Sequence, residues 1–255
     1  MTSLLHYMRD DLNLALDATV TANSADSAYP IANVIALPIS DPYRSTGIAS
    51  EYIAIDFGSS VAISFAAIIN HNLTSGATIT LKAGTTVAVS DFSVAVTRRE
   101  FDAYLEIAQQ TYRYWQIAFA DASNPDGYIQ VGYIQLGVLL SFAKGYVAET
   151  PFDDEMVNVR QQTQAGVPAI RHLYRRVSRV FSFRNMEISQ RNEIRTVYTS
   201  LQGDATPIFV IPDETIYEGY FGRFINETLR SVPGFLWGIE QLYFREESRG
   251  FSMAN

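Results

Sequence analysis

The chain has 255 residues, of which 47% are hydrophobic and 18% charged, and its net charge is −8 at neutral pH. This composition is typical of a globular protein with enough apolar side chains for a core. The absence of cysteine excludes disulfides, thiolate metal sites and cysteine nucleophiles. No window approaches the roughly 18 uninterrupted apolar residues of a membrane span, and the N-terminus lacks the layout of a signal peptide. We therefore expect synthesis in the cytoplasm and no membrane insertion.

The N-terminal half is strongly acidic. Residues 1–140 carry 6 basic and 13 acidic side chains, whereas residues 141–255 carry 13 and 14. An acidic surface repels the phosphate groups of DNA and RNA. We therefore expect no sequence-specific nucleic-acid partner.

Short apolar runs between turn signals characterise the first part of the chain. Residues 1–25 predict an edge strand or an arm, because leucines alternate there with polar residues. The strands that follow have the length and spacing of a β-sandwich or jelly roll. They are predicted at Tyr52–Phe57, Phe65–Ile69, Ala77–Ala83, Thr86–Val89, Phe101–Ile107, Tyr112–Phe119 and Tyr128–Leu136.

Turn chemistry predicts how some of these strands end. The first strand has period-two alternation and is expected to run into a turn at Gly58-Ser-Ser. Asn124-Pro-Asp-Gly127 is a turn signal because Gly tolerates positive φ and Pro fixes the entry to the turn. Thr111–Phe119 and Tyr128–Leu136 would then form a hairpin that closes the sandwich.

Four motifs follow one another along this part of the chain. They are Ala28-Tyr-Pro-Ile-Ala-Asn33, Tyr43-Arg-Ser45, Glu51–Phe57 with Ile68–Leu73, and Tyr112-Arg-Tyr-Trp-Gln-Ile117. In that order they resemble the galactose-binding-like jelly roll (discoidin, or coagulation factor type C). The resemblance covers about residues 25–138. It implies a domain that recognises surfaces and rarely does chemistry.

The pattern changes after Gly137. Pro151–Pro168 is polar and rich in Gln, which suits either a linker or a functional loop that grips a neighbour. An amphipathic helix is predicted near 189–202, with Ser189 as N-cap and Gly203 as the C′ residue. Strands are predicted at Arg179–Phe183, Pro207–Ile211, Tyr217–Ile225 and Phe235–Phe244.

The motifs of this second half, in chain order, are Tyr174-Arg-Arg-Val177, Phe181-Ser-Phe183, the predicted helix, Ile208–Asp213, Tyr220–Arg223 and Trp237–Glu246. They resemble the tube-type β-sandwich with one packed helix found in tail proteins of long-tailed bacteriophages, particularly distal tail and baseplate-hub proteins. We predict a mainly β chain of two domains. Residues 1–138 would form the galactose-binding-like jelly roll, and residues 139–255 a tail-tube-like β domain that forms rings.

Nothing in the sequence marks a catalytic centre. The only histidines, His6, His71 and His172, lack metal-type spacing, and no Gly-x-Ser-x-Gly elbow is present. We expect no enzyme activity and no cofactor. Four acidic residues could either bind a structural calcium ion or form a solvated acidic surface. Their spacing does not match that of an EF-hand, so the solvated surface is favoured. The four residues are Asp10, Asp11, Asp17 and Asp26.

Five residues are candidates for a ligand site. They are Tyr43, Arg44, Asn72, Arg98 and Arg99. Sugar sites combine an aromatic face with charged or amide groups. The favoured interpretation is structural: Tyr43-Arg-Ser45 begins a framework strand, as in the resembled jelly roll, and Asn-His-Asn at 70–72 satisfies backbone groups at a turn.

Aromatic residues and arginine also interleave at Tyr112–Gln116. Such a pattern is compatible with base stacking. In an acidic domain, core packing for Trp115 and a surface ion pair for Arg113 are the favoured interpretation.

An arginine-rich run at 171–195 is the main functional signal in the second half. Arginine is suited to interfacial ion pairs because its planar fork holds carboxylates in a bidentate manner. Basic and acidic patches on opposite edges of a protomer would suit a head-to-tail ring; a solvated charged face is the alternative. The interface candidates are Arg171, Arg175, Arg176, Arg179, Asp153, Asp154 and Glu155.

The sequence thus supports two hypotheses of different classes. In the first, the chain is a structural virion protein of a phage tail tip that forms a ring, expected to be a hexamer from the resemblance, and docks neighbouring tail proteins. In the second, it is a carbohydrate-binding protein that recognises host-surface glycans through the jelly roll.

Overall fold

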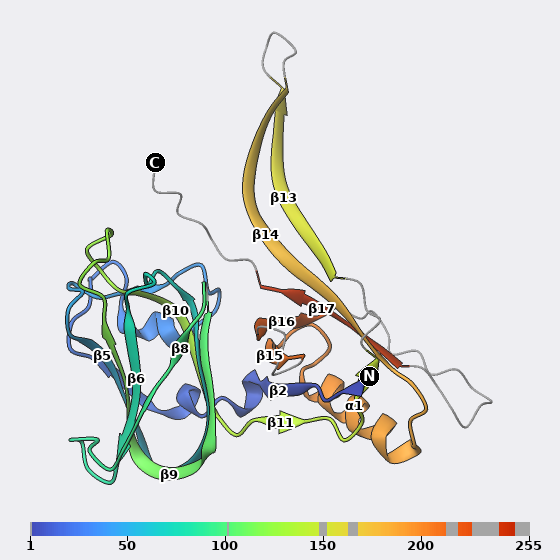
Figure 1. Cartoon of the computed structure of the whole chain (residues 1–255), viewed down its shortest axis with the longest axis horizontal. Coiled ribbons are helices and arrows are strands. Elements are labelled where there is room, and N and C mark those ends of the chain that lie inside the picture. Colours follow the sequence, from blue (N-terminus) through green and yellow to red (C-terminus); the bar gives the residue numbers. More distant parts are fainter. Residues whose placement is uncertain are drawn as a thin grey trace. The chain divides into compact units, whose positions relative to one another are not determined.

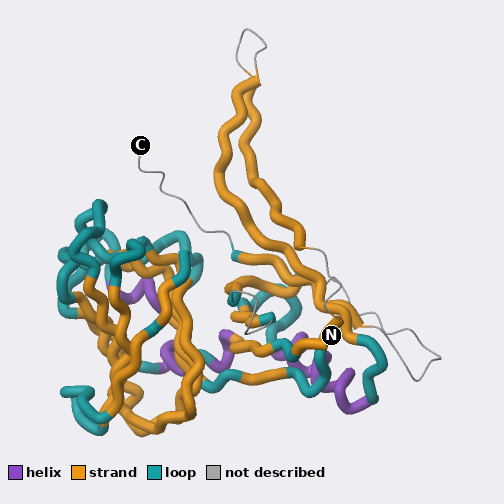
Figure 2. Tube along the Cα trace, viewed as in Figure 1, coloured by secondary structure: helices purple, strands orange, loops and turns teal. Residues whose placement is uncertain are grey.

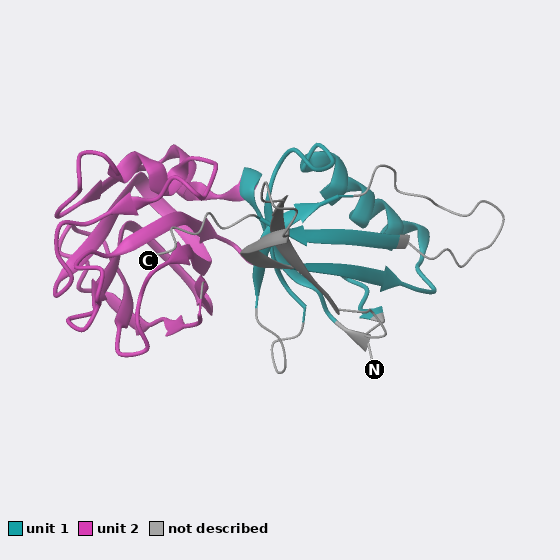
Figure 3. Cartoon of the chain, turned by 90° about the horizontal axis from the view of Figure 1, so that it is seen from above, with its two compact units in different colours: residues 1–11, 140–255 teal, residues 12–139 magenta. Residues whose placement is uncertain are grey.

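In the computed structural model, antiparallel strands dominate and one α-helix is present among the described residues (Figures 1 and 2). The described residues are 2–100, 102–147, 152–162, 168–212, 219–225 and 240–247. The chain divides into two compact units (Figure 3). Unit 1 comprises residues 1–11 and 140–255, and unit 2 comprises residues 12–139. The predicted mainly β fold with one helix is confirmed.

Unit 2 is built on one sheet with the strand order β4-β10-β5-β9-β6-β7, to which β3 adds beside β5 and β8 beside β9. Its strands are β3 (Thr19–Ala22), β4 (Tyr43–Arg44), β5 (Glu51–His71), β6 (Thr78–Gly84), β7 (Phe92–Ala95), β8 (Thr97–Arg98), β9 (Asp102–Ala120) and β10 (Gln130–Gly137). Short 3₁₀ turns are η1 (Asp10–Leu12), where the chain passes between the units, η2 (Leu14–Asp17) and η3 (Ile31–Ile35).

Two long strands, β5 and β9, fold this sheet into a sandwich. The first part of β5 pairs with β3 and its last part pairs with β10, while β9 follows it along the other edge. The register between β5 and β9 shifts after Asp56 and again after Ile63. Such bulges bend a strand, and Figure 1 shows β9 curving between the two layers. Apolar side chains from both halves therefore meet in one core around Trp115, which is 1% exposed.

The predicted turn at Gly58 is wrong, because β5 continues through it. Gly58 takes a positive φ of 73° inside the strand, and its N–H donates to Asp56 Oδ1 at 2.8 Å. The polar segment Gly58-Ser-Ser60 forms a bulge at which β5 bends, and the strand continues beyond it. The two strands predicted at 101–107 and 112–119 likewise form one strand, β9.

Two further predictions in unit 2 are also wrong. Strand β10 pairs with β5 and β4 and not with β9, so the expected hairpin does not form. Residues 86–89 form a loop, not a strand, and Val89 takes a φ of 44°, which lies outside the β region. The turn at 124–127 is confirmed, with Gly127 at a φ of 76° and its N–H donating to the carbonyl oxygen of Asn124.

Unit 1 contains a sheet of strand order β1-β12-β14-β17-β16-β15-β2-β11, with β13 paired to β14. Its strands are β1 (Thr2–Ser3), β2 (His6–Arg9), β11 (Leu140–Ser141), β12 (Tyr146–Val147), β13 (Phe152–Gln162), β14 (Pro168–Phe183), β15 (Ile208–Ile211), β16 (Tyr220–Phe224) and β17 (Glu240–Glu246). Helix α1 (Ile188–Ser200) packs Ile194 and Val197 into the core of this unit.

Helix α1 begins one residue earlier than predicted, so Ser189 is not its N-cap. Glu187 is the N-cap and forms a capping box with Gln190. This arrangement satisfies two backbone N–H groups that the first helical turn leaves without partners. Gly203 follows the helix with a φ of 74°, but Gln202, at a φ of 53°, is the first left-handed residue.

The N-terminal residues belong to unit 1, which differs from the predicted domain at 1–138. Strand β2 lies between β15 and β11, with Tyr7 opposite both Val210 and Leu140. Leu5 and Tyr7 are buried in the core of unit 1. A strand with partners on both edges lies inside its sheet, so the expectation of an arm or edge strand is wrong for β2. In contrast, β1 and β3 each pair with a single strand among the described residues.

Residues predicted to form a linker or loop at 151–168 include strand β13. It pairs antiparallel with β14 over the whole of Phe152–Gln162. Figure 1 shows this hairpin running out beyond β17 within unit 1. The polar composition concealed the strand, because the expected alternation of apolar and polar residues is absent there.

We predict that Asn13→Ala lowers the stability of unit 2. The buried Asn13 side chain donates to the carbonyl oxygen of Ile134 at 2.9 Å and accepts the N–H of Leu136 at 3.0 Å. Its removal leaves these buried backbone groups unsatisfied, which costs about 2 kcal/mol. Urea unfolding followed by tryptophan fluorescence measures the change. Gln109→Ala, on the exposed bend of β9, is the control and should change stability by less than about 0.5 kcal/mol; equal midpoints would contradict the prediction.

Candidate functional site

The structure places Tyr43 and Arg44 in the framework of unit 2. Tyr43 is 1% exposed, and its hydroxyl donates to the carbonyl oxygen of Ser24 at 2.7 Å. Burial raises the pKa of Tyr43 to about 12, and nearby Glu51 adds to the shift. The Arg44 guanidinium lies over the rings of Tyr29 and Tyr128, 3.9 and 4.5 Å from their centroids. The framework role favoured for this segment is confirmed.

Asn72 also bonds within the fold. Its amide nitrogen donates to Asp126 Oδ2 at 2.9 Å and to the carbonyl oxygen of Tyr128 at 3.0 Å. Its Oδ1 accepts the N–H of Gln130 at 2.7 Å. Arg44 Nε also donates to Gln130, through Oε1, at 3.2 Å. The prediction that the Asn-His-Asn segment satisfies backbone groups is therefore confirmed, and Gln130 brings Asn72 and Arg44 together.

Arg98 and Arg99 have separate partners. Arg98 Nε donates to the carbonyl oxygen of Leu73 at 2.8 Å, next to Asn72. Arg99 stacks on Tyr104, 3.6 Å from the ring centroid. Arg44, Asn72 and Arg98 thus lie near one another, while Tyr43 is buried and Arg99 contacts a different strand. A ligand role for these residues stays a prediction.

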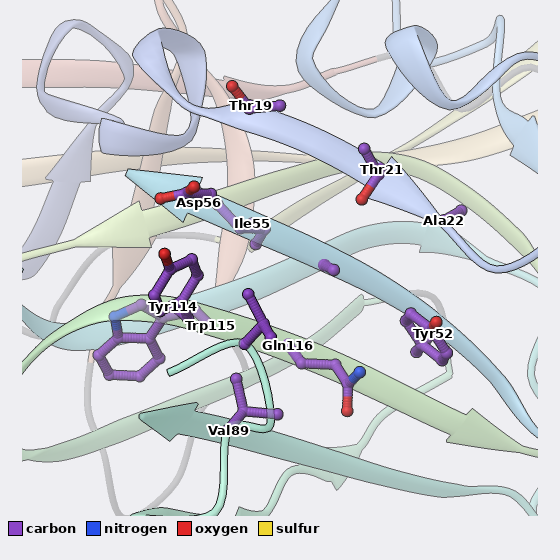
Figure 4. Close-up of a pocket in the computed structure, with 12 residues that line it drawn as sticks. Thr19, Thr21, Ala22, Tyr52, Ile55, Asp56, Val89, Tyr114, Trp115 and Gln116 are labelled. Atoms are coloured by element: carbon purple, nitrogen blue, oxygen red, sulfur yellow. The ribbon is translucent and has the colours of Figure 1, made fainter. Parts of the chain in front are cut away.

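A cavity of about 420 Å³ opens instead on the outer face of β3, β5 and β9. Its volume is within the usual range of small-ligand sites. The lining residues come from these strands and from the loop after β6 (Figure 4). They are Thr19, Thr21, Ala22, Tyr52, Ala54, Ile55, Asp56, Val87, Val89, Tyr114, Trp115 and Gln116.

Strand register explains how the outward side chains of this lining share one face, whereas Ile55 and Trp115 belong to the buried core. Successive side chains of a strand point to opposite sides of the sheet. Thr19, Asp56 and Tyr114 lie opposite one another in one row across β3, β5 and β9. Thr21, Ala54 and Gln116 form the next row in the same way. Tyr52 begins a third row further along β5, so the cavity lies over three adjacent rows.

Residues of the loop after β6 line one side of the cavity. Asp91 Oδ2 accepts from the N–H and the hydroxyl of Thr85, at 2.7 and 2.9 Å, and these two hydrogen bonds lower the pKa of the Asp91 carboxyl. Val87 is 78% exposed at the tip, whereas Val89 is buried. A positive φ is unusual for a β-branched residue, so this loop holds Val89 in a strained conformation.

An ion pair lies at one end of the cavity. Arg113 Nε and Nη2 donate to the two carboxylate oxygens of Asp56 at 2.7 and 2.9 Å. Arg113 is the main cause that lowers the pKa of Asp56, with the Gly58 N–H second, and the pair in turn raises the pKa of Arg113. The favoured interpretation of residues 112–116, a buried Trp115 and a surface pair for Arg113, is confirmed.

Sequence reasoning did not identify the cavity. The alternation of Tyr52, Ala54 and Asp56 was apparent, but it indicated only a half-buried strand. A usable signal was the kind of outward side chain, because two aromatic residues, an amide and a carboxylate share the solvent side of β5 and β9. Their assembly depends on the register between strands that are distant in sequence, such as Ala54 with Gln116, 62 residues apart, which the sequence does not specify.

The charged interface candidates lie mainly in the hairpin of unit 1. Glu155 lies directly opposite Arg176 in the register of β13 and β14, and Asp153 lies opposite Ser178. The acidic and basic segments are therefore neighbouring strands and not opposite edges of the protomer, which corrects that part of the prediction. The interface role stays a prediction, and the side chains of six candidates lie outside the described residues. They are Arg171, Arg175, Arg176, Asp153, Asp154 and Glu155.

Arg179 is the candidate whose side chain is described. It is buried, donates through Nη2 to the hydroxyl of Tyr220, and lies 4.2 Å from the centroid of that ring. Both of these contacts lie within unit 1. Among the described residues, no group of three or more His, Asp or Glu could hold a metal ion. Within the same residues, no helix is long and apolar enough to cross a membrane.

Comparisons with known proteins give structural matches only; no family model and no curated protein matches the chain. Chitosan-binding module 1 from a chitosanase/glucanase of Paenibacillus sp. IK-5 is 15% identical, with a TM-score of 0.42 over 49% of this chain and 97% of that one. A Streptococcus pneumoniae fucose binding module is 10% identical, with a TM-score of 0.43 and coverages of 49% and 94%. The lectin domain of lectinolysin, complexed with Lewis B antigen, is 7% identical, with a TM-score of 0.41 and coverages of 49% and 94%.

These matches concern the N-terminal half, where a jelly roll was expected. At such identities they describe the fold alone, so the ligands of those modules are not assigned to this chain. The resemblance of the C-terminal half to phage tail proteins stays a prediction.

We predict that Arg113→Ala raises the pKa of Asp56, because it removes both guanidinium hydrogen bonds. The Gly58 N–H remains, so the pKa should stay below its ordinary value. Since the folded pKa is lowered, the pair stabilises the fold at neutral pH, and this contribution is lost as the pH falls through the folded pKa. NMR titration of the side-chain carboxyl carbons measures the shift. Asp91, which is bonded to Thr85, is the internal control; an unchanged Asp56 titration would contradict the prediction.

Proposed function

We propose that this chain is a structural protein of a phage tail tip, a distal-tail or baseplate component. Unit 1 assembles with copies of itself, and unit 2 docks neighbouring tail proteins or host-surface glycans. The observation that carries the proposal is the β13–β14 hairpin of unit 1.

Both outer edges of this hairpin are open within the described residues. Residues 168–177 of β14 pair with β13 alone, and β17 joins β14 only from Ser178 onward. Over its described length, β13 pairs with no strand other than β14. A two-stranded ribbon is marginally stable in water, and unpaired edges recruit further strands. The hairpin therefore suits pairing with another chain.

A second copy of this chain is the partner that the strand sequences favour. Strand β13 carries Asp153-Asp-Glu155 near its start, and the part of β14 that pairs with β13 alone carries Arg171, Arg175 and Arg176. The open edge of β13 can therefore pair with the open edge of β14 in the next copy, which repeats the antiparallel pairing inside each hairpin. Such contacts join different surfaces of each subunit, so they are heterologous and close into a ring if the rotation allows.

We predict that shortening the hairpin abolishes this assembly. Met156 and Arg175 are opposite one another, so Asn-Gly in place of residues 157–174 gives a two-residue hairpin turn. The pairing of β14 with β17 begins at Ser178 and is preserved. Light scattering coupled to size-exclusion chromatography should find rings for the full chain and a monomer for the variant.

Circular dichroism and thermal unfolding of the shortened variant show whether it is folded. Negative-stain images give the symmetry of the rings, for which a hexamer is expected. Assembly of the shortened variant to the same size as the full chain would overturn the role of the hairpin. A full chain that stays monomeric at every concentration would overturn the structural proposal.

The second candidate function is carbohydrate binding by unit 2, and the cavity on β3, β5 and β9 favours it. An aromatic ring can stack on the apolar face of a sugar, while amide and hydroxyl groups bond its hydroxyls. Tyr52, Gln116 and Thr21 supply these three kinds of group around one cavity.

We predict that the full chain binds glycans if this second candidate is correct. A glycan array probed with the fluorescently labelled chain tests it, with a chain heated beyond unfolding as the control. Reproducible binding to a defined class of sugars supports the candidate function. An array without a specific signal contradicts it and leaves the assembly proposal unaffected.

A further inference from the structure

We propose that the outer face of β3, β5 and β9 binds an uncharged oligosaccharide of more than one ring, laid along β5 between Tyr52 and Asp56. The inference rests on the carbohydrate-binding candidate above and specifies its site and its ligand class. None of the five ligand-site candidates from the sequence lines this face.

The shape of the face suits a chain molecule. Tyr52 and Asp56 are four residues apart on one side of β5, which corresponds to about 13 Å in an extended strand. This span is longer than a single sugar ring. Ala54 lies between them, and its small side chain leaves the floor of the cavity low. A groove with a low centre and raised ends can hold successive rings.

The polar groups on this face are available. Within the described residues, no hydrogen bond engages the amide of Gln116 or the hydroxyls of Thr19 and Thr21. By contrast, Arg44, Asn72 and Arg98 all have hydrogen-bond partners inside the fold. An amide and a hydroxyl both donate and accept, as the hydroxyls of a sugar do. The face therefore matches the hydrogen-bonding character of a carbohydrate.

The charges on the face compensate one another. Asp56 is the one carboxylic acid among the lining residues, and both of its oxygens accept from Arg113. Lys82 lies opposite Gln116 on β6 but does not line the cavity. No uncompensated charge is thus directed at the ligand, which favours a neutral sugar over an acidic or amino sugar.

Aromatic side chains mark the two ends of the groove. Tyr52 is 37% exposed and Tyr114 is half-buried beside Asp56 (Figure 4). Their separation places one ring near each end, so that two sugar rings can each meet an aromatic side chain. A peptide strand fits less well, because a sheet face has no free backbone groups with which to pair it.

The loop after β6 gives the groove a fixed wall. A Cβ at Gly84 would lie 2.9 Å from Val89 Cα and 3.2 Å from the carbonyl oxygen of Thr86, so the loop folds back tightly on this glycine. Strained backbone such as that of Val89 is concentrated at ligand clamps and active sites. A wall that is already in place reduces the ordering needed on binding.

The test measures binding of the full chain to neutral polysaccharides by affinity electrophoresis, followed by calorimetry with oligosaccharides of increasing length. We expect affinity to rise from one sugar ring to three. Tyr52→Ala and Gln116→Ala should each weaken binding about ten-fold. Gly84→Ala should also weaken it, because the added methyl group displaces the wall without removing a contacting side chain.

Matched controls separate this site from the rest of the surface. Tyr243 is 42% exposed in unit 1, and Gln109 is exposed on the bend of β9. Tyr243→Ala and Gln109→Ala should leave the affinity within about two-fold of the original. Circular dichroism verifies that every variant is folded.

The outcomes distinguish the site from the function. If the chain binds a neutral sugar and the Tyr52 and Gln116 variants bind equally well, the site is wrong and the carbohydrate-binding candidate stands. Binding restricted to charged glycans overturns the proposed ligand class. If the chain binds no sugar at all, both the site and the candidate function are overturned, and a peptide of a neighbouring protein becomes the ligand to test.

Discussion

The continuous antiparallel pairing of β5 with β9 is the constraint on which unit 2 depends. Because both strands bend at the same place, a single ladder crosses from one layer of the sandwich to the other. The inward side chains of this ladder form the core, and its outward side chains form the cavity. A shift of one residue in this register would exchange the two faces. Stability and the candidate site therefore depend on the same hydrogen bonds.

Local patterns predicted much of this architecture. Alternation at 52–57 identified inward and outward residues correctly, and the turn at 124–127 followed from its proline and glycine. The same local signals were misleading at Gly58, where a glycine that normally ends a strand instead forms a bulge. Whether such a residue turns the chain or bends it depends on the neighbouring strand, and the sequence alone does not show which strand that is.

The candidate site illustrates the same limit. Tyr43 and Arg44 have side chains of the kind found in sugar sites. In the fold, however, Tyr43 is buried in the core and the Arg44 guanidinium lies over two tyrosine rings. Nothing in the sequence marks Gln116 as a site residue. It lines the cavity because the strand register places it in one row with Ala54 and Thr21. Long-range pairing also joined the acidic segment at 153–155 to the arginine-rich strand, which composition alone had separated.

One consequence concerns the order in which the chain folds. Unit 2 is inserted between β2 and β11, which are themselves antiparallel neighbours in the sheet of unit 1. While unit 2 is unfolded, residues 12–139 form a very long flexible loop between these two strands. Pairing the strands then requires closure of this loop, and the entropic cost of closure rises with loop length. Once unit 2 has folded, its entry and exit points are fixed, so most of that entropy is already lost. Folding of unit 2 thus lowers the entropic cost of pairing β2 with β11 in unit 1, and a replacement with similarly spaced ends would have the same effect.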